Sequence, residues 1–197
     1  MSNETHRRFD PWRTAPVEED SRTTSLRSHY FNVEHVTLSS ADEGVFERDI
    51  LTEARGDTVG IVAMTDDHTI PFIEQYRVPT HRWTLEIPCG HALDSNEQPK
   101  DVAVRKLRDE VGYQAQSLVQ FTRFINTPSF STQHTVLFYA QGLTPVPTGT
   151  VGPETPRFEV RHFTIDEAYQ LVVNGTILDA KTVIAVLRLK AGLLIPR

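Results

Sequence analysis

Cysteine is almost missing from this chain of 197 residues, since Cys89 is the only one. A disulfide within the chain is therefore excluded, which fits a reducing compartment. Long apolar runs are missing as well. No stretch approaches the roughly 20 residues that cross a membrane, and residues 1–20 lack the apolar centre of a secretion signal. The sequence predicts a cytoplasmic protein that does not enter a membrane.

An excess of positive charge is also lacking. The chain has 20 lysines and arginines against 26 aspartates and glutamates, for a formal net charge of -6. A nucleic-acid backbone needs a concentrated basic face, so no nucleic-acid partner is expected. A small anionic ligand is still compatible with this charge, because a few local cations and a metal ion suffice to hold one.

Three regions follow from the patterning. Residues 1–25 are polar and show little periodicity, which predicts a flexible tail. Within residues 26–57, apolar side chains alternate with polar ones on both sides of the turn at 41–44, which predicts a small antiparallel β hairpin. Residues 58–197 are expected to form the main domain.

The main domain has strand patterns followed by helix patterns. We expect strands at 58–64, 70–76, 83–87, 118–126, 135–141 and 158–163, with a loop at 142–156. A first helix is expected at 99–111, where Val104, Leu107 and Val111 form one stripe. A second helix is expected to run from the capping box Thr164–Glu167 to Gly175. A third helix is expected at 179–191, with a buried stripe made of Val183, Ile184, Leu187 and Ala191. The order predicts an α/β fold in which helices cover the faces of a mixed sheet.

The chemistry is concentrated where the strand at 83–87 turns, through Cys89 and Gly90, into the helix at 99–111. On that helix Lys106, Asp109 and Glu110 share one face and lean back toward the turn. Clustered oxygen donors of this kind suit Mg²⁺ or Mn²⁺. The alternative interpretation is a solvated helix face, which is the usual role of such a charge run.

This segment resembles the Nudix box, which has Gly, five residues, Glu, seven residues and then Arg-Glu-apolar-x-Glu-Glu-x-Gly-apolar. Gly90, Glu97, Arg105, Glu110 and Gly112 match, although six residues separate Gly90 from Glu97. Asp109 is a shortened Glu, and Lys106 stands where the family has a metal-binding Glu. Segments 75–77, 85–88 and 127–131 also resemble bacterial ADP-ribose diphosphatases, so the resemblance implies a Nudix α/β/α sandwich.

The resemblance also implies roles for single residues. Glu110 is the main expected metal ligand, with Asp109 secondary and the backbone carbonyl of Cys89 as a third. Glu110, Glu154 and Arg105 are the catalytic candidates: Glu154 lies where the subfamily keeps its water-activating Glu, and Arg105 pairs with Glu97 to hold the loop. Arg77, Glu86 and Phe130 are the candidates for substrate contact. The alternatives are a surface role for Glu154, a strand-end role for Arg77 and core packing for Phe130.

Lys106 is the departure that matters most. It replaces a carboxylate by a cation, which lowers the expected metal affinity. Alternatively, its ammonium pairs with Glu110 or Asp109 and occupies roughly the space of one metal ion. Such a site either works with fewer metal ions or binds a phosphate directly through the lysine.

Two main functions therefore stay open. The first is metal-dependent hydrolysis of ADP-ribose, or of a related nucleoside diphosphate sugar, to AMP and a sugar phosphate. The second is a Nudix-fold nucleotide-binding or regulatory module with impaired catalysis, and a purely structural protein without a pocket is a third possibility. The resemblance also implies a homodimer with its contact in the N-terminal hairpin.

Overall fold

The fold is described from a computed structural model of residues 9–94, 96–149 and 160–193. In chain order its elements are β1 (Glu18–Arg27), β2 (Phe31–Ser40), β3 (Gly44–Glu53), β4 (Thr58–Ala63), β5 (Thr69–Arg77), the 3-10 turn η1 (Val78–Thr80), β6 (Arg82–Glu86), β7 (Cys89–Gly90), α1 (Pro99–Val111), β8 (Tyr113–Ile125), β9 (His134–Pro145), β10 (Val160–Thr164), α2 (Ile165–Val173) and α3 (Ala180–Lys190). No helix in the described ranges is long and apolar enough to cross a membrane.

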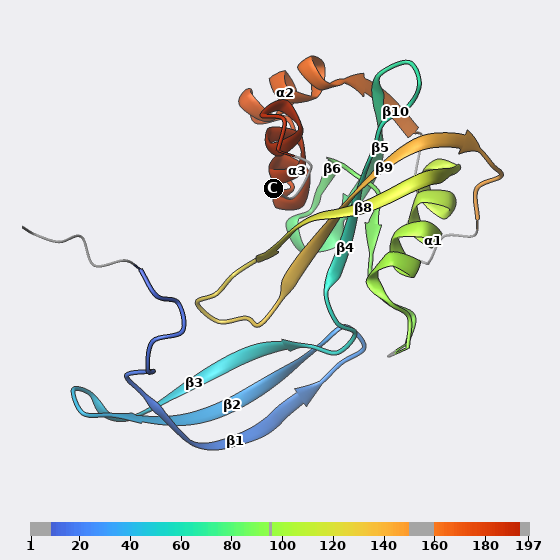
Figure 1. The fold of residues 1–197 in the computed structure, drawn as a ribbon. Coiled ribbons are helices and arrows are strands. Elements are labelled where there is room, and N and C mark those ends of the chain that lie inside the picture. Colours follow the sequence, from blue (N-terminus) through green and yellow to red (C-terminus); the bar gives the residue numbers. More distant parts are fainter. Residues whose placement is uncertain (1–8, 95, 150–159, 194–197) are drawn as a thin grey trace, which may run out of the picture.

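The N-terminal region is a three-stranded antiparallel sheet in the order β1-β2-β3. The predicted hairpin is its β2–β3 pair, in which Ser40 pairs with Gly44 across the turn. Gly44 has a φ of 69°, a left-handed conformation that glycine adopts without a steric cost. Figure 1 shows this sheet at one end of the molecule, beside the main body.

The predicted flexible tail is wrong for residues 18–25. These residues lie in β1, which pairs with β2 from Glu18 to Arg27. Nearly every side chain of β1 is exposed, so no apolar alternation marks it, and its backbone hydrogen bonds to β2 hold it in place. Charged side chains suit such an exposed edge strand. Residues 1–8 lie outside the described part of the chain.

The main body has three layers, as predicted. Its strands form two sheets, in the orders β7-β4-β9-β8 and β10-β5-β6, and the first is mixed because β4 and β9 run parallel. Helix α1 covers one face, while α2 and α3 cover the other (Figure 1). Each face has its own apolar core, with Leu107 of α1 in one and Val186 of α3 in the other. A single central sheet was the expectation, and the structure divides it into two.

Helix α1 begins and ends where the sequence predicts. Pro99 occupies its first turn, and Gly112 follows it with a φ of 72°. The predicted stripe is wrong at Val104, which is 48% exposed, whereas Leu107 and Val111 are buried. Asp109 and Glu110 are buried as well, so this helix has a packed face that carries charge.

The two C-terminal helices are also confirmed, with corrected faces. The capping box is formed: Thr164 accepts a hydrogen bond from the Glu167 backbone, and Glu167 accepts one from the Thr164 backbone. In α3 the predicted buried stripe is wrong at Leu187 and Ala191, which are exposed, while Val183 and Ile184 are partly buried against the core. The fully buried residues of α3 are Lys181, Thr182, Ala185 and Val186. Strands β8 and β9 exceed their predicted ranges, and β9 includes 142–145 of the predicted loop. Residues 150–159 lie outside the described ranges.

The N-terminal sheet is joined to the main body at β3. The Leu51 N–H donates to the Phe130 carbonyl at 2.8 Å, and the Leu51 carbonyl accepts from the Thr132 N–H at 3.0 Å. Next to this contact, the Glu53 carboxylate accepts a hydrogen bond from the His134 N–H at 3.2 Å. Burial, reinforced by the charge of Asp57, raises the pKa of Glu53 to about 7. The junction therefore contains a carboxyl group that favours its neutral form.

Replacing Glu53 by glutamine is expected to stabilise the protein at pH 8. The raised pKa of Glu53 means that the wild-type chain loses stability as the pH rises from the ordinary value of 4.5 to about 7. Glutamine cannot ionise, so the variant avoids that loss. The expected gain in the free energy of unfolding is about 1 kcal/mol, because solvent screens the charge of this half-exposed group. Urea unfolding at pH 5 and pH 8 measures the effect. An equal change at both pH values would contradict the assignment.

Candidate functional site

The site is built around Cys89 and Gly90, which form the short strand β7 directly after the bend at 87–88; this segment is called the Cys89–Gly90 turn below. Cys89 and Gly90 pair with Gly60 and Val59 of β4, which fixes the turn against the sheet. Helix α1 packs on the same strands and brings Glu110 to the turn. One carboxylate oxygen of Glu110, Oε2, accepts a hydrogen bond from the Cys89 backbone N–H at 2.9 Å. Glu110 thus faces the turn, where the sequence analysis expected it.

Lys106 lies one helical turn before Glu110 and contacts it directly. The Lys106 ammonium donates to Glu110 Oε1 at 3.0 Å, and the two side chains are 19% and 4% exposed. The lysine stem lies against Gly90: a Cβ on that glycine would be 2.2 Å from Lys106 Cε. The absence of a side chain at Gly90 therefore makes room for the lysine beside Glu110.

Asp109 has different partners from Glu110. Its Oδ1 accepts a hydrogen bond from Arg108 Nε at 2.9 Å. The same oxygen lies only 2.1 Å from where a Cβ on Gly149 would stand, so the loop after β9 packs over this carboxylate. Asp109 was expected to face the Cys89–Gly90 turn, but its contacts in the structure are with Arg108 and this loop.

Glu97 and Arg105 form the ion pair that the sequence predicts. Arg105 donates from Nε and Nη2 to the two carboxylate oxygens of Glu97, at 2.7 and 2.8 Å. The guanidinium also donates to the His91 carbonyl at 3.0 Å, and Glu97 accepts from the Leu93 N–H at 2.7 Å. The hydrogen bond from Arg105 lowers the pKa of Glu97. This pair holds the loop between β7 and α1 against the helix.

Arg77 and Glu86 are paired with each other. Arg77 donates from Nε and Nη2 to the two Glu86 oxygens, at 2.7 and 2.6 Å. The Glu86 side chain is 2% exposed and also accepts from the Lys181 ammonium at 2.5 Å. Lys181 in turn pairs with Asp179, at 2.7 Å. Glu86 was predicted to contact substrate, and the structure instead places it in a buried charge network beneath the turn.

The charges in this network stabilise one another. Burial alone would raise the pKa of Glu86, but the hydrogen bond from Arg77 and the charge of Lys181 lower it to about 2. Burial opposes the charge of Lys181, yet the surrounding negative charges raise the pKa of this lysine above its ordinary value. Burial also raises the pKa of the Cys89 thiol to about 11. The raised pKa favours the neutral thiol of Cys89 at pH 7, which is less nucleophilic than a thiolate.

Lys181 and Asp179 are the network members that the sequence analysis missed. Both come from the start of α3, more than 90 residues after Glu86 in the sequence. One signal was present: Lys181 lies in the first turn of a predicted helix, where the helix dipole disfavours a cation. Such a lysine needs a carboxylate nearby, although the sequence does not say which one. Thr182 adds a second link, since its hydroxyl accepts a hydrogen bond from the Ile87 N–H.

Phe130 and Glu154 are the last two predicted site residues. The Phe130 side chain is 52% exposed, and its backbone lies in the segment that binds β3. This exposure rules out core packing as its role and leaves the ring accessible. Glu154 lies outside the described residues.

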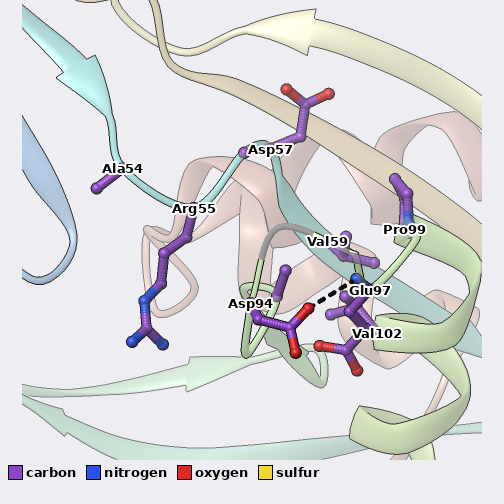
Figure 2. Close-up of a pocket in the computed structure, with 10 residues that line it drawn as sticks. Ala54, Arg55, Asp57, Val59, Asp94, Glu97, Pro99 and Val102 are labelled. Carbon is purple, nitrogen blue, oxygen red and sulfur yellow. Dashed lines mark hydrogen bonds between the residues drawn. The ribbon is translucent and has the colours of Figure 1, made fainter.

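A pocket of about 260 Å³ lies beside this site, between the β3–β4 linker and the loop before α1. Figure 2 shows Arg55 and Asp57 of the linker on one side and Asp94 and Glu97 on the other. The Glu97 N–H donates to Asp94 at 3.2 Å, which shapes the pocket wall. Among the described lining residues, Glu97 is the one that occupies a matched position of the predicted box, and Cys89 and Gly90 do not line the pocket.

The donor set does not match a preformed metal cage. Within the described ranges, no group of three or more His, Cys, Asp or Glu side chains is placed to hold a metal ion. Glu110 already receives the Lys106 ammonium and the Cys89 N–H, and Asp109 receives Arg108. The described side chains at the turn therefore offer one carboxylate, already balanced by a cation.

Comparisons with known proteins agree with this geometry. The model of the NUDIX domain matches residues 54–184. The chain is 34% identical over 137 residues to the ADP-ribose pyrophosphatase of Bacillus subtilis (strain 168), covering 68% of this chain and 74% of that protein. It is 34% identical over 128 residues to the methanol dehydrogenase activator of Bacillus methanolicus, covering 65% and 69%. A crystal structure of an ADP compounds hydrolase, 23% identical, has the same fold, with a TM-score of 0.79 over 91% of this chain and 95% of the other. The chain belongs to the Nudix family.

Proposed function

We propose that the chain hydrolyses the diphosphate bond of ADP-ribose, or of a related nucleoside diphosphate sugar, giving AMP and a sugar phosphate. The observation that carries this proposal is the Glu110 carboxylate held at the Cys89–Gly90 turn by the Cys89 N–H. Support for the substrate class comes from the relative named ADP-ribose pyrophosphatase.

The neighbouring residues have distinct roles in this proposal. Glu110 is the carboxylate at the reacting bond, and the Glu97–Arg105 pair keeps the preceding loop in place. Arg77 is 31% exposed while it pairs with Glu86, so we assign its outer edge to a substrate phosphate. Phe130 offers an exposed ring on which a base can stack. Glu154 keeps its proposed role in activating water.

A divalent ion, Mg²⁺ or Mn²⁺, is part of the proposal. Nudix hydrolases generally use such ions, and Mg²⁺ in proteins is often bound through one or two carboxylates together with substrate phosphates. Glu110 is the described carboxylate that fits this role. When bound, the ion would supply positive charge to the diphosphate.

The test is to incubate the purified protein with ADP-ribose and either Mg²⁺ or Mn²⁺ and to measure the released nucleoside monophosphate by chromatography, AMP from ADP-ribose and GMP from GDP-mannose. GDP-mannose serves as a second substrate with a different base and sugar. We expect AMP together with ribose phosphate, in amounts that increase linearly with protein concentration. If neither compound is cleaved with either ion, the hydrolase proposal fails.

A second function is favoured by one observation, the Lys106–Glu110 pair. If the lysine blocks turnover, the chain is a nucleotide-binding or regulatory module of the Nudix fold. That function predicts an ADP-ribose-induced rise in Tm without AMP release. It further predicts that Lys106→Glu creates or raises hydrolytic activity.

We also propose that the chain forms a homodimer through its N-terminal sheet. Apolar side chains are exposed there, with Val45 72% and Leu26 51% exposed. Covering them with a second copy would bury this surface. Sedimentation of the intact chain, beside a Val45→Lys variant, tests the proposal.

A further inference from the structure

Among the described residues, Lys106 is a cation in direct contact with Glu110, at 3.0 Å. We propose that Lys106 is the resident cation of the site: it neutralises Glu110, so that a divalent ion binds only together with the diphosphate of a substrate, which the same ammonium contacts. The inference deepens the proposed function and rests on it for the substrate class.

The first support is the packing of Lys106. Its ammonium is 3.0 Å from Glu110 Oε1, while Glu110 Oε2 is occupied by the Cys89 N–H. The lysine stem fills the space above Gly90 that any other residue would take with its Cβ. The side chain is 19% exposed, so it is packed in one position and still reaches the surface of the site.

The second support is the charge balance of the turn. Among the described residues, three cations meet three carboxylates in the ion pairs around it. The cations are Arg77, Lys106 and Lys181, and the carboxylates are Glu86, Glu110 and Asp179. A divalent ion that approached Glu110 in this neutral arrangement would lie close to the Lys106 ammonium, and the two positive charges would repel each other. The described side chains around the turn therefore give a divalent ion little net electrostatic attraction in the free protein.

A diphosphate changes this balance because it brings at least two negative charges. The Lys106 ammonium has three donors, and the structure commits one of them to Glu110. Lysine binds phosphate well as a point charge, so the ammonium can turn toward the ligand. That movement would take the ammonium off Glu110 Oε1, and the Glu110 carboxylate would then help to hold a divalent ion that accompanies the diphosphate.

The test measures metal binding without relying on activity. Mn²⁺ is titrated into the free protein and followed by electron paramagnetic resonance, with and without α,β-methylene-ADP as a diphosphate that resists hydrolysis. We compare the wild-type chain with Lys106→Glu and Gly90→Ala. The alanine pushes the lysine stem away from Glu110 and leaves the net charge unchanged. Lys100→Glu, an exposed site on the same helix, is the matched control for charge.

We expect weak Mn²⁺ binding by the free wild-type protein and at least tenfold tighter binding with α,β-methylene-ADP. Without that ligand, Lys106→Glu should bind Mn²⁺ at least a hundredfold more tightly, and Gly90→Ala about tenfold more tightly, whereas Lys100→Glu should stay within threefold of the wild type. Gly90→Ala decides the question alone if Lys106→Glu does not fold. Tight Mn²⁺ binding by the free wild-type protein, unchanged when the ammonium is displaced, would overturn the proposal.

The phosphate contact is tested separately, by calorimetry without any metal ion. Lys106→Met should weaken the binding of α,β-methylene-ADP at least tenfold, whereas Lys100→Met should leave it unchanged. Equal affinity in the wild type and Lys106→Met would overturn the contact. These results do not depend on turnover, so a protein that binds as expected but releases no AMP contradicts only the hydrolase function.

Discussion

Replacing Glu110 by glutamine is expected to lower AMP release from ADP-ribose by about 10² to 10⁴-fold, the contribution typical of an ionisable side chain positioned at the reacting group. Glutamine has nearly the same shape, and its carbonyl oxygen still accepts the hydrogen bond from the Cys89 N–H. The turn therefore stays in place while the negative charge at the reacting bond is removed. The measurement is kcat at saturating ADP-ribose and Mg²⁺, together with Tm to establish that the variant folds.

Asp101→Asn is the matched control for this prediction. Asp101 is exposed in the first turn of the same helix, so the substitution removes one negative charge far from the turn. Its activity should remain within about twofold of the wild type, since exposed charges interact weakly with distant groups. Wild-type activity in Glu110→Gln would remove Glu110 from the catalytic site and leave the hydrolase proposal without its central residue.

The local features of this fold were predictable from short stretches of sequence. Helix α1 is bounded by Pro99 and Gly112, and the start of α2 is set by Thr164 and Glu167, because each of these residues acts on backbone groups next to it. The turn before Gly44 was predicted for the same reason. Such interactions need no knowledge of distant residues.

The faces of the elements were harder to predict because partners distant in the sequence decide them. Lys181 and Thr182 of α3 are buried because Lys181 donates a hydrogen bond to the Glu86 carboxylate and Thr182 accepts one from the Ile87 N–H. Both partners lie near the end of β6, far away in the sequence. Strand β1 shows the same limit: its exposed side chains have no apolar alternation, and its pairing with β2 is through the backbone.

The candidate site was predictable in its residues but less so in its contacts. Glu110 and the Glu97–Arg105 pair lie where the Nudix resemblance implied. Glu86 was taken as a substrate contact, yet its carboxylate is enclosed by Arg77 and Lys181. The spacing of Arg77 and Glu86 brings them onto neighbouring strands, but the lysine that completes the network comes from the other end of the chain.

Replacing Lys181 by methionine is expected to destabilise the protein by about 3–5 kcal/mol, because it leaves a buried carboxylate with one of its two cations missing. The Lys181 side chain is 10% exposed, so water does not replace the lost ammonium. Chemical unfolding in urea measures the loss. Lys190→Met is the matched control on the same helix: that lysine pairs with Asp166 at the surface, and its loss should cost at most about 1 kcal/mol.

The pH dependence of this variant identifies Glu86 as the cause. In the wild type, the lowered pKa of Glu86, about 2 against an ordinary 4.5, contributes stability above pH 4.5 that is lost as the pH falls toward 2. Removing Lys181 raises the pKa of Glu86, so the acid-labile contribution shrinks: its loss still begins near pH 4.5 but is complete at a higher pH than in the wild type. Adding Glu86→Gln should recover part of the stability, since the stranded charge is then gone. If the loss of unfolding free energy in the double variant equals the sum of the losses in the two single variants, Lys181 and Glu86 act independently. The network would then have no role in holding the turn that carries Cys89.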